Sequence, residues 1–152
     1  MMLKAIALFF AILFAFASPS FADSPAPRKI DVDLTKMSGT IIYAMVNQMV
    51  TYPVKFKGKH IKMKGFFSSY YDEEVERRFY GCVIQDALAC CSQGLAFELS
   101  KSREYPKEYP EEGATIVIEG DFDYEKDEGG GGFPIIRNAE ILNQRETSIS
   151  KN

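Results

Sequence analysis

The chain has three cysteines, and two of them, Cys90 and Cys91, are neighbours. One intramolecular disulfide uses two of the three sulfurs and leaves one thiol over. Adjacent cysteines bridge each other only with strain, because a disulfide requires Cα atoms more than about 4.4 Å apart, whereas a trans peptide places neighbours about 3.8 Å apart. The pair must therefore bridge to Cys82, bind a metal, stay reduced or react with another molecule.

A metal site is the first hypothesis, since thiolates are soft ligands that zinc and copper(I) accept. If residues 86–89 form the turn of a hairpin, Cys82 lies close to Cys90 or Cys91, because neighbouring strands are about 4.8 Å apart. Neighbouring residues of a regular strand point to opposite faces, so this site requires irregular backbone at the pair. An oxygen or nitrogen ligand would complete the shell: Asp86, Glu98 or His60.

A structural disulfide is the second hypothesis. Cys82 would then bond to Cys90 or Cys91, and the third cysteine would be buried as a small apolar residue. Redox chemistry has the least support, because no group close in sequence would lower a thiol pKa.

The sequence predicts no enzyme. His60 is the single histidine, so no second histidine can act as base or ligand, and no serine lies in a nucleophile elbow. The four glycines at 129–132 precede Phe133-Pro134 and a strand pattern. A phosphate-binding loop would instead lead into a helix.

Nucleic acid is excluded as a partner on charge. The formal net charge is −3. One short segment is rich in cationic and potentially cationic residues: Lys55, Lys57, Lys59, His60, Lys62 and Lys64. However, the acidic segments 72–76 and 123–128 would flank a groove on this strand. They would repel phosphate within a Debye length of about 8–10 Å.

The N-terminus has the pattern of a signal peptide over residues 1–22. Lys4 supplies the positive region, 5–17 is almost continuously apolar, and Ser20-Phe21-Ala22 fits a cleavage site. The apolar run is shorter than the roughly 18 residues of a membrane span. We therefore expect a soluble periplasmic or secreted protein with no membrane insertion after signal cleavage.

The hydrophobic pattern predicts the elements that position the cysteines. A flexible lead-in covers 23–37, and a helix begins at the N-cap Ser38 and ends at Tyr52, before Pro53. A period of two then predicts five strands separated by polar loops. The expected strands are 54–67 (bent at Gly58), 79–85, 90–99, 115–124 and 133–142, and a disordered tail covers 143–152.

This order of elements predicts a mainly β domain over residues 38–142. The expected fold is a five-stranded OB-like antiparallel barrel preceded by one amphipathic helix. A helix-capped meander or sandwich would produce a similar pattern.

Two segments carry a resemblance to known proteins. They are FKGKHIKMKG at 56–65 and FYGCVIQDALACCSQGLAFEL at 79–99. They resemble small exported bacterial proteins that have an OB-like domain and an Asp-Ala-x-x-Cys-Cys segment. Those proteins resemble in turn the cysteine-pair OB-like domain of a permease-associated family of bacterial membrane proteins. The resemblance covers roughly 42–142 and implies a fold and a cysteine pair, but no activity.

Two functions follow as expectations. The first is an exported, non-enzymatic OB-like domain that binds zinc or copper through its cysteines. The alternative is a disulfide-stabilised binding or structural module that contacts a protein or glycan partner.

Overall fold

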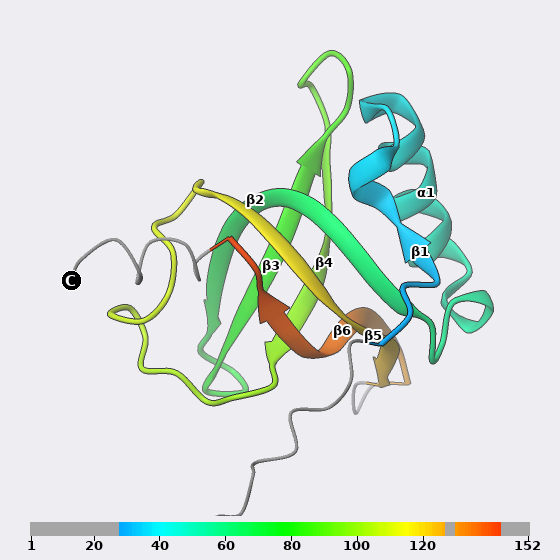
Figure 1. Cartoon of the computed structure of the whole chain (residues 1–152). Coiled ribbons are helices and arrows are strands. Elements are labelled where there is room, and N and C mark those ends of the chain that lie inside the picture. The colour runs from blue at the N-terminus through cyan, green and yellow to red at the C-terminus, as the bar shows by residue number, and fades with distance from the viewer. Residues whose placement is uncertain (1–27, 127–129, 144–152) are drawn as a thin grey trace, which may run out of the picture.

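The computed structural model describes residues 28–126 and 130–143. The expected signal peptide and nearly all of the expected disordered tail lie outside these residues. One sheet and one main helix make up the fold (Figure 1). In chain order the elements are β1 (Val32–Asp33), the 3-10 turn η1 (Leu34–Lys36), α1 (Gly39–Thr51), the 3-10 turn η2 (Pro53–Lys55), β2 (His60–Asp72), β3 (Arg77–Gln85), β4 (Ser92–Leu99), β5 (Thr115–Lys126) and β6 (Gly132–Ile141).

The sheet closes on itself through its hydrogen bonds. Its order is β1-β2-β3-β4-β6-β5, and β5 also pairs with β2, so β2 to β6 form a ring of pairings. The sheet is six-stranded and mixed, which corrects the expected five antiparallel strands. β1 pairs in parallel with β2, and β4 in parallel with β6. Two chain reversals separate β4 from β6, so these two strands run in the same direction when they meet.

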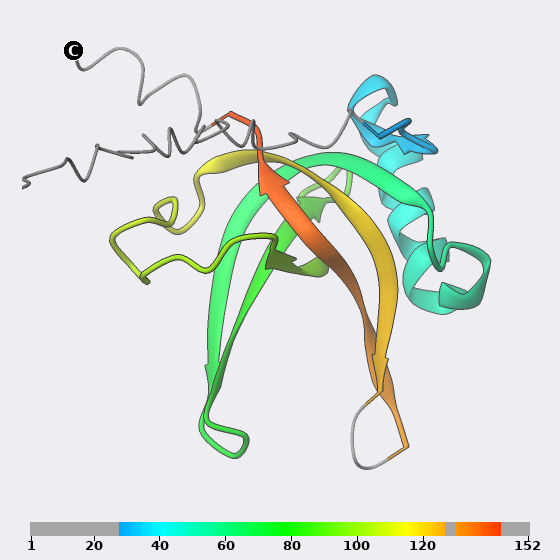
Figure 2. The same cartoon turned by 60° about the horizontal axis from the view of Figure 1, so that its bottom comes forward.

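Two long hairpins and the helix complete the arrangement. β2 pairs antiparallel with β3, and β5 pairs antiparallel with β6. Figure 2 shows both hairpins projecting toward the same end of the molecule, with α1 beside the ring. Among the described residues, no helix has both the length and the apolar character that crossing a membrane requires.

Helix α1 forms where the apolar residues recur at helical spacing. Val46 and Met49, three residues apart, are fully buried, because residues at this spacing share one helix face. Ser38 is the N-cap, as predicted, and Tyr52 is the C-cap. The helix ends there because Pro53 has no N–H with which to continue the ladder.

The first predicted strand begins too early. Residues 53–55 form the 3-10 turn η2 with Pro53 at its first position, where the fixed φ of proline is favourable. Phe56 then packs its ring edge-on against Phe122, with the ring centroids 5.9 Å apart. Gly58 adopts a φ of 77°, so the bend expected at this glycine is present, and β2 follows it.

Strand β2 is also longer at its far end than the sequence indicates. The segment expected to connect the first two strands, 70–78, is mostly strand, because Asp72 pairs with Arg77. The turn proper is only 73–76. Asp72 helps to close it, since its Oδ1 accepts a hydrogen bond of 2.9 Å from the N–H of Glu74.

The core lies inside the ring and under α1. In β2, alternate residues Ile61, Met63 and Phe67 are buried, as the period of two predicts. Part of the expected flexible lead-in belongs to this core: Leu34 in η1 is fully buried, and the N–H of Asp31 donates to the carbonyl of His60. The ring therefore holds the N-terminal segment against β2.

Candidate metal site

The turn between β3 and β4 holds the cysteine pair. It spans residues 86–91, and its ends meet where the N–H of Asp86 donates to the carbonyl of Cys91 over 2.9 Å. Ala89 lies inside it with a φ of 54°, a conformation that is uncommon for residues other than glycine. β4 begins at Ser92, not at Cys90 as predicted. Both cysteines thus lie on irregular backbone, which the metal hypothesis requires.

Asp86 organises the pair. Its Oδ1 accepts hydrogen bonds from the N–H of Cys90 at 2.9 Å and of Cys91 at 3.4 Å. Its Oδ2 lies 3.0 Å from the Cys90 Sγ, which donates to it. The two sulfurs are 3.8 Å apart, and one ligand atom from each of the three residues lies within 4.8 Å of the others. Both cysteines are exposed, so an ion has access to them.

The same contacts set the protonation of the site. The hydrogen bond to Asp86 raises the pKa of the Cys90 thiol, since deprotonation would place two negative charges side by side. The same hydrogen bond is the main cause of a lowered pKa for Asp86. Cys90 is therefore a protonated thiol beside a carboxylate, and an ion that binds here must displace that proton.

Helix α1 lies beside the turn (Figure 1). The side chain of Gln93 donates to the Asn47 amide oxygen over 3.2 Å. Burial, followed by the charges of Cys91 and Asp86, raises the pKa of Tyr43. Tyr43 was not among the predicted site residues, because the helical period places it in the helix but does not indicate which loop the helix meets.

Cys82 is not part of this cluster. It is a free, fully buried thiol on β3, opposite Leu95. Gln85 pairs with Ser92 beside the turn, so Cys82 lies three residues further along the strand, about 10 Å away at about 3.3 Å per residue. A disulfide needs Cα atoms within about 7 Å. The expected bridge from Cys82 to Cys90 or Cys91 is therefore wrong, and burial raises the pKa of the Cys82 thiol to about 12.

His60 belongs to a different cluster. Its Nδ1 lies 2.9 Å from Oδ1 of Asp121, and its backbone N–H donates to Asp31 over 2.8 Å. Arg28 forms an ion pair with the same Asp121 oxygen at 2.5 Å. Glu98, the other ligand considered, accepts a hydrogen bond from Arg137. Of the predicted site residues, the structure brings together Asp86, Cys90 and Cys91 alone.

No protein-family model matches the chain, and a comparison with curated proteins found no match. The resemblance stated for residues 56–65 and 79–99 therefore stays a prediction.

Proposed function

We propose that the protein is an exported, non-enzymatic OB-like domain that binds a soft metal ion through Cys90, Cys91 and Asp86. One observation carries the proposal: two sulfurs and a carboxylate oxygen lie within 4.8 Å of one another on an exposed turn. Sulfur ligands favour zinc and copper(I) over magnesium or calcium, which prefer oxygen.

The number of ligands distinguishes the two ions. Zinc takes four ligands in a tetrahedron, and sites with three protein ligands keep an open position for water or another molecule. The turn offers three donors, so a zinc ion here would keep one position open. Copper(I) favours soft sulfur ligands, and Cys90 and Cys91 supply two of them. In both cases the exposed turn suits an ion that is passed to or received from another molecule.

The arrangement of the strands supports the OB-like part of the proposal. Five strands, β2 to β6, form the ring, and β5 pairs back to β2. The OB-fold is a five-stranded, partly open barrel of this kind. Its outer turns are free to vary, which is compatible with a ligand site at the β3–β4 turn.

The test is metal titration of protein purified under reducing conditions without affinity nickel. We expect the native chain to bind one zinc or copper(I) ion in competition with a chromophoric chelator. Cys90→Ser and Cys91→Ser should each weaken binding by at least about tenfold, because each removes one sulfur ligand of the ion. Cys82→Ala is the matched thiol control and should keep the affinity. Equal binding by the double Cys90→Ser/Cys91→Ser variant would overturn the proposal.

The alternative function was expected to rest on a disulfide, and no disulfide joins the three cysteines in this structure. A module that contacts a protein or glycan partner remains a second candidate. A cavity at the other end of the β3–β4 hairpin is compatible with a sugar ligand, which is the glycan part of that hypothesis.

A further inference from the structure

A cavity of about 370 Å³ opens at the end of the β3–β4 hairpin opposite to the cysteine turn. Its walls come from the start of β3 at 77–80, the end of β4 at 96–99 and the loop that follows β4. Small-molecule sites occupy about 300–1,000 Å³, so the cavity has room for a small ligand. This site is independent of the proposed metal function.

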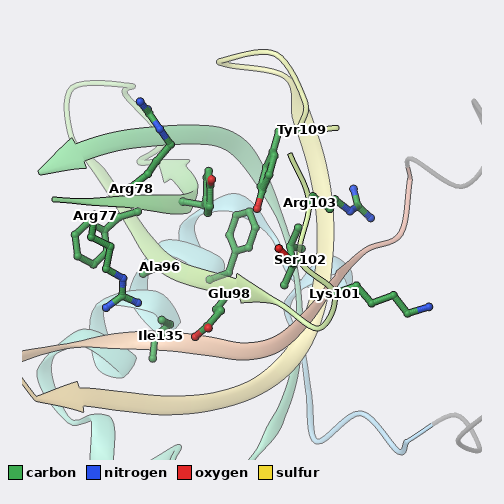
Figure 3. A pocket seen from close by; sticks show the side chains of 13 residues that line it. Arg77, Arg78, Ala96, Glu98, Lys101, Ser102, Arg103, Tyr109 and Ile135 are labelled. Atoms are coloured by element: carbon green, nitrogen blue, oxygen red, sulfur yellow. The ribbon is translucent and has the colours of Figure 1, made fainter. Parts of the chain in front are cut away.

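The lining is cationic in a chain whose net charge is −3. Four cationic residues, Arg77, Arg78, Lys101 and Arg103, line the cavity with a single carboxylate, Glu98. Figure 3 shows Arg77 and Arg78 on one side of the cavity and Lys101 and Arg103 on the other. The charged ends of Arg78 and Lys101 extend outward on opposite sides of this view, so the two rim charges flank the cavity.

The two rim charges, Arg78 and Lys101, have no carboxylate partner in the described part of the chain. Arg77, by contrast, is neutralised by Glu125. Arg78 instead donates to the Ser69 hydroxyl over 3.3 Å and lies over the Tyr105 ring at 4.2 Å from its centroid. These contacts fix the guanidinium without cancelling its charge. Lys101 likewise forms no ion pair with any described residue.

Part of the lining of the cavity is aromatic. The rings of Tyr80 and Tyr109 stack with centroids 4.2 Å apart and planes 18° from parallel, and Phe97 lies 6.1 Å from Tyr80. Burial, then the hydrogen bond to Tyr80, raises the pKa of Tyr109. Its hydroxyl therefore stays protonated and does not repel an anion.

We propose that the cavity binds a small organic anion whose six-membered ring packs on the tyrosines and whose oxyanion is attracted by the positive charges of Arg78 and Lys101 at the rim. Arg pairs well with carboxylate and phosphate because its planar fork matches their geometry. Aromatic faces accept both sugar and aromatic rings. The common chemistry is a ring with an attached oxyanion, from either an acidic sugar or an aromatic acid.

The test is a chemical-shift titration of the full chain with matched probes. Phenyl phosphate and glucose 6-phosphate carry both parts, inorganic phosphate lacks the ring, and phenol and glucose lack the charge. We expect one of the two complete probes to shift resonances of the lining residues and to bind at least about fivefold more tightly than inorganic phosphate and than its neutral parent. Which probe binds decides between the sugar and the aromatic source.

Charge variants distinguish binding in the cavity from a general attraction between the anion and positive charges on the protein surface. Lys101→Gln removes an exposed rim charge and should weaken binding of that probe by about fivefold. Arg78→Gln should act in the same direction. Lys64→Gln is the matched control, because Lys64 is exposed and lies outside the lining. Binding of neither complete probe, equal binding of the neutral parent, or an equal loss in Lys64→Gln would overturn the proposal.

Discussion

At the scale of single residues, the Asp86 carboxylate controls the cysteine pair. It accepts hydrogen bonds from the backbone N–H groups of Cys90 and Cys91, which fix their backbone, and a further hydrogen bond from the Cys90 thiol. The carboxylate thus has two opposing effects. It holds the sulfurs in place for an ion, and it keeps one of them protonated.

The first prediction concerns pH. Because the pKa of Cys90 is raised, a metal ion competes with a proton for its sulfur, and the metal affinity should rise as the pH increases from about 6 to 8. Competition titrations across this range, with proton release measured in weak buffer, check it. An affinity that stays constant over the range would contradict a thiolate ligand.

The second prediction separates the two effects of Asp86. In Asp86→Asn the negative charge is gone, so the pKa of Cys90 should fall and its alkylation at neutral pH should become faster. The same change should weaken metal binding, because one oxygen ligand is lost. Mass spectrometry of iodoacetamide adducts over time measures the first effect. Slower alkylation in the variant would contradict the role assigned to the carboxylate.

The third prediction concerns Cys82. Its side chain is fully buried, so Cys82→Ser places a hydroxyl among apolar neighbours and should lower the free energy of unfolding by about 1–3 kcal/mol. Cys91→Ser, on the exposed turn, should change it by less than about 0.5 kcal/mol. Urea unfolding of both variants provides the measurement, and equal stabilities would mean that Cys82 is not a core residue.

Local spacing accounts for what the sequence could predict at the site. Asp86, Cys90 and Cys91 lie within one turn, so their proximity follows from a hairpin. Cys82 is as close to Asp86 in sequence as Cys90 is, but it lies along an extended strand, where each residue adds about 3.3 Å. The register that separates it from the pair depends on the cross-strand pairing of Gln85 with Ser92, which no local pattern shows.

At the scale of elements, Gly65 allows β2 and β3 to approach each other. A Cβ at this position would lie 2.6 Å from the Val83 carbonyl oxygen and 2.8 Å from the Cys82 sulfur. Backbone cannot move aside as a flexible side chain can. The strand therefore requires glycine at this point because of space, not because of its dihedral angles.

The fourth prediction follows from this close approach. Gly65→Ala should lower the free energy of unfolding by about 1–3 kcal/mol through overpacking. Gly39→Ala is the matched control: a Cβ there meets nothing within 4 Å, and alanine in a helix is favoured over glycine by up to about 1 kcal/mol. Thermal unfolding of both variants tests the pair, and a Gly65→Ala protein as stable as the native chain would contradict the packing argument.

The ends of the elements were harder to predict than their centres. The buried alternation of Ile61, Met63 and Phe67 identifies β2 because one face meets the core. Tyr70 and Tyr71, near its end, are exposed, and exposed strand ends have the same polar composition as loops. The sequence did not indicate the cavity for the same reason: Arg78 was expected in a charged connection and Lys101 in a polar loop, and only the tertiary fold determines which residues lie beside such segments.

At the scale of the whole molecule, carboxylates join segments that are distant in sequence. Glu125 on β5 receives hydrogen bonds from Arg77 on β3 and Arg137 on β6. Asp121 contacts His60 on β2 and Arg28 in the N-terminal segment. These ion pairs are partly exposed, so each contributes little alone, but together they hold four parts of the chain against β5.

The fifth prediction is acid sensitivity. Burial raises the pKa of Asp121, but the hydrogen bond with His60 and the charge of Arg28 have the opposite effect, and the pKa lies below 3.8. The hydrogen bond from Arg77 likewise lowers the pKa of Glu125 below 4.5. A carboxyl group whose pKa is lowered on folding stabilises the folded state at a pH above its pKa in the unfolded chain. This contribution is lost as the pH falls through its pKa in the folded chain. The urea midpoint should thus decrease below about pH 4.5, and less steeply in Asp121→Asn. A urea midpoint that does not change below this pH would contradict the stabilising role of these carboxylates.

The position of β6 has a consequence for folding. This strand lies between β4 and β5, so the chain cannot complete the ring until residues 132–141 have joined it. Until then the outer edge of β4 is exposed, and such an edge can pair with other unfinished polypeptides. We expect chaperones that bind extended segments to protect this edge until the ring is complete.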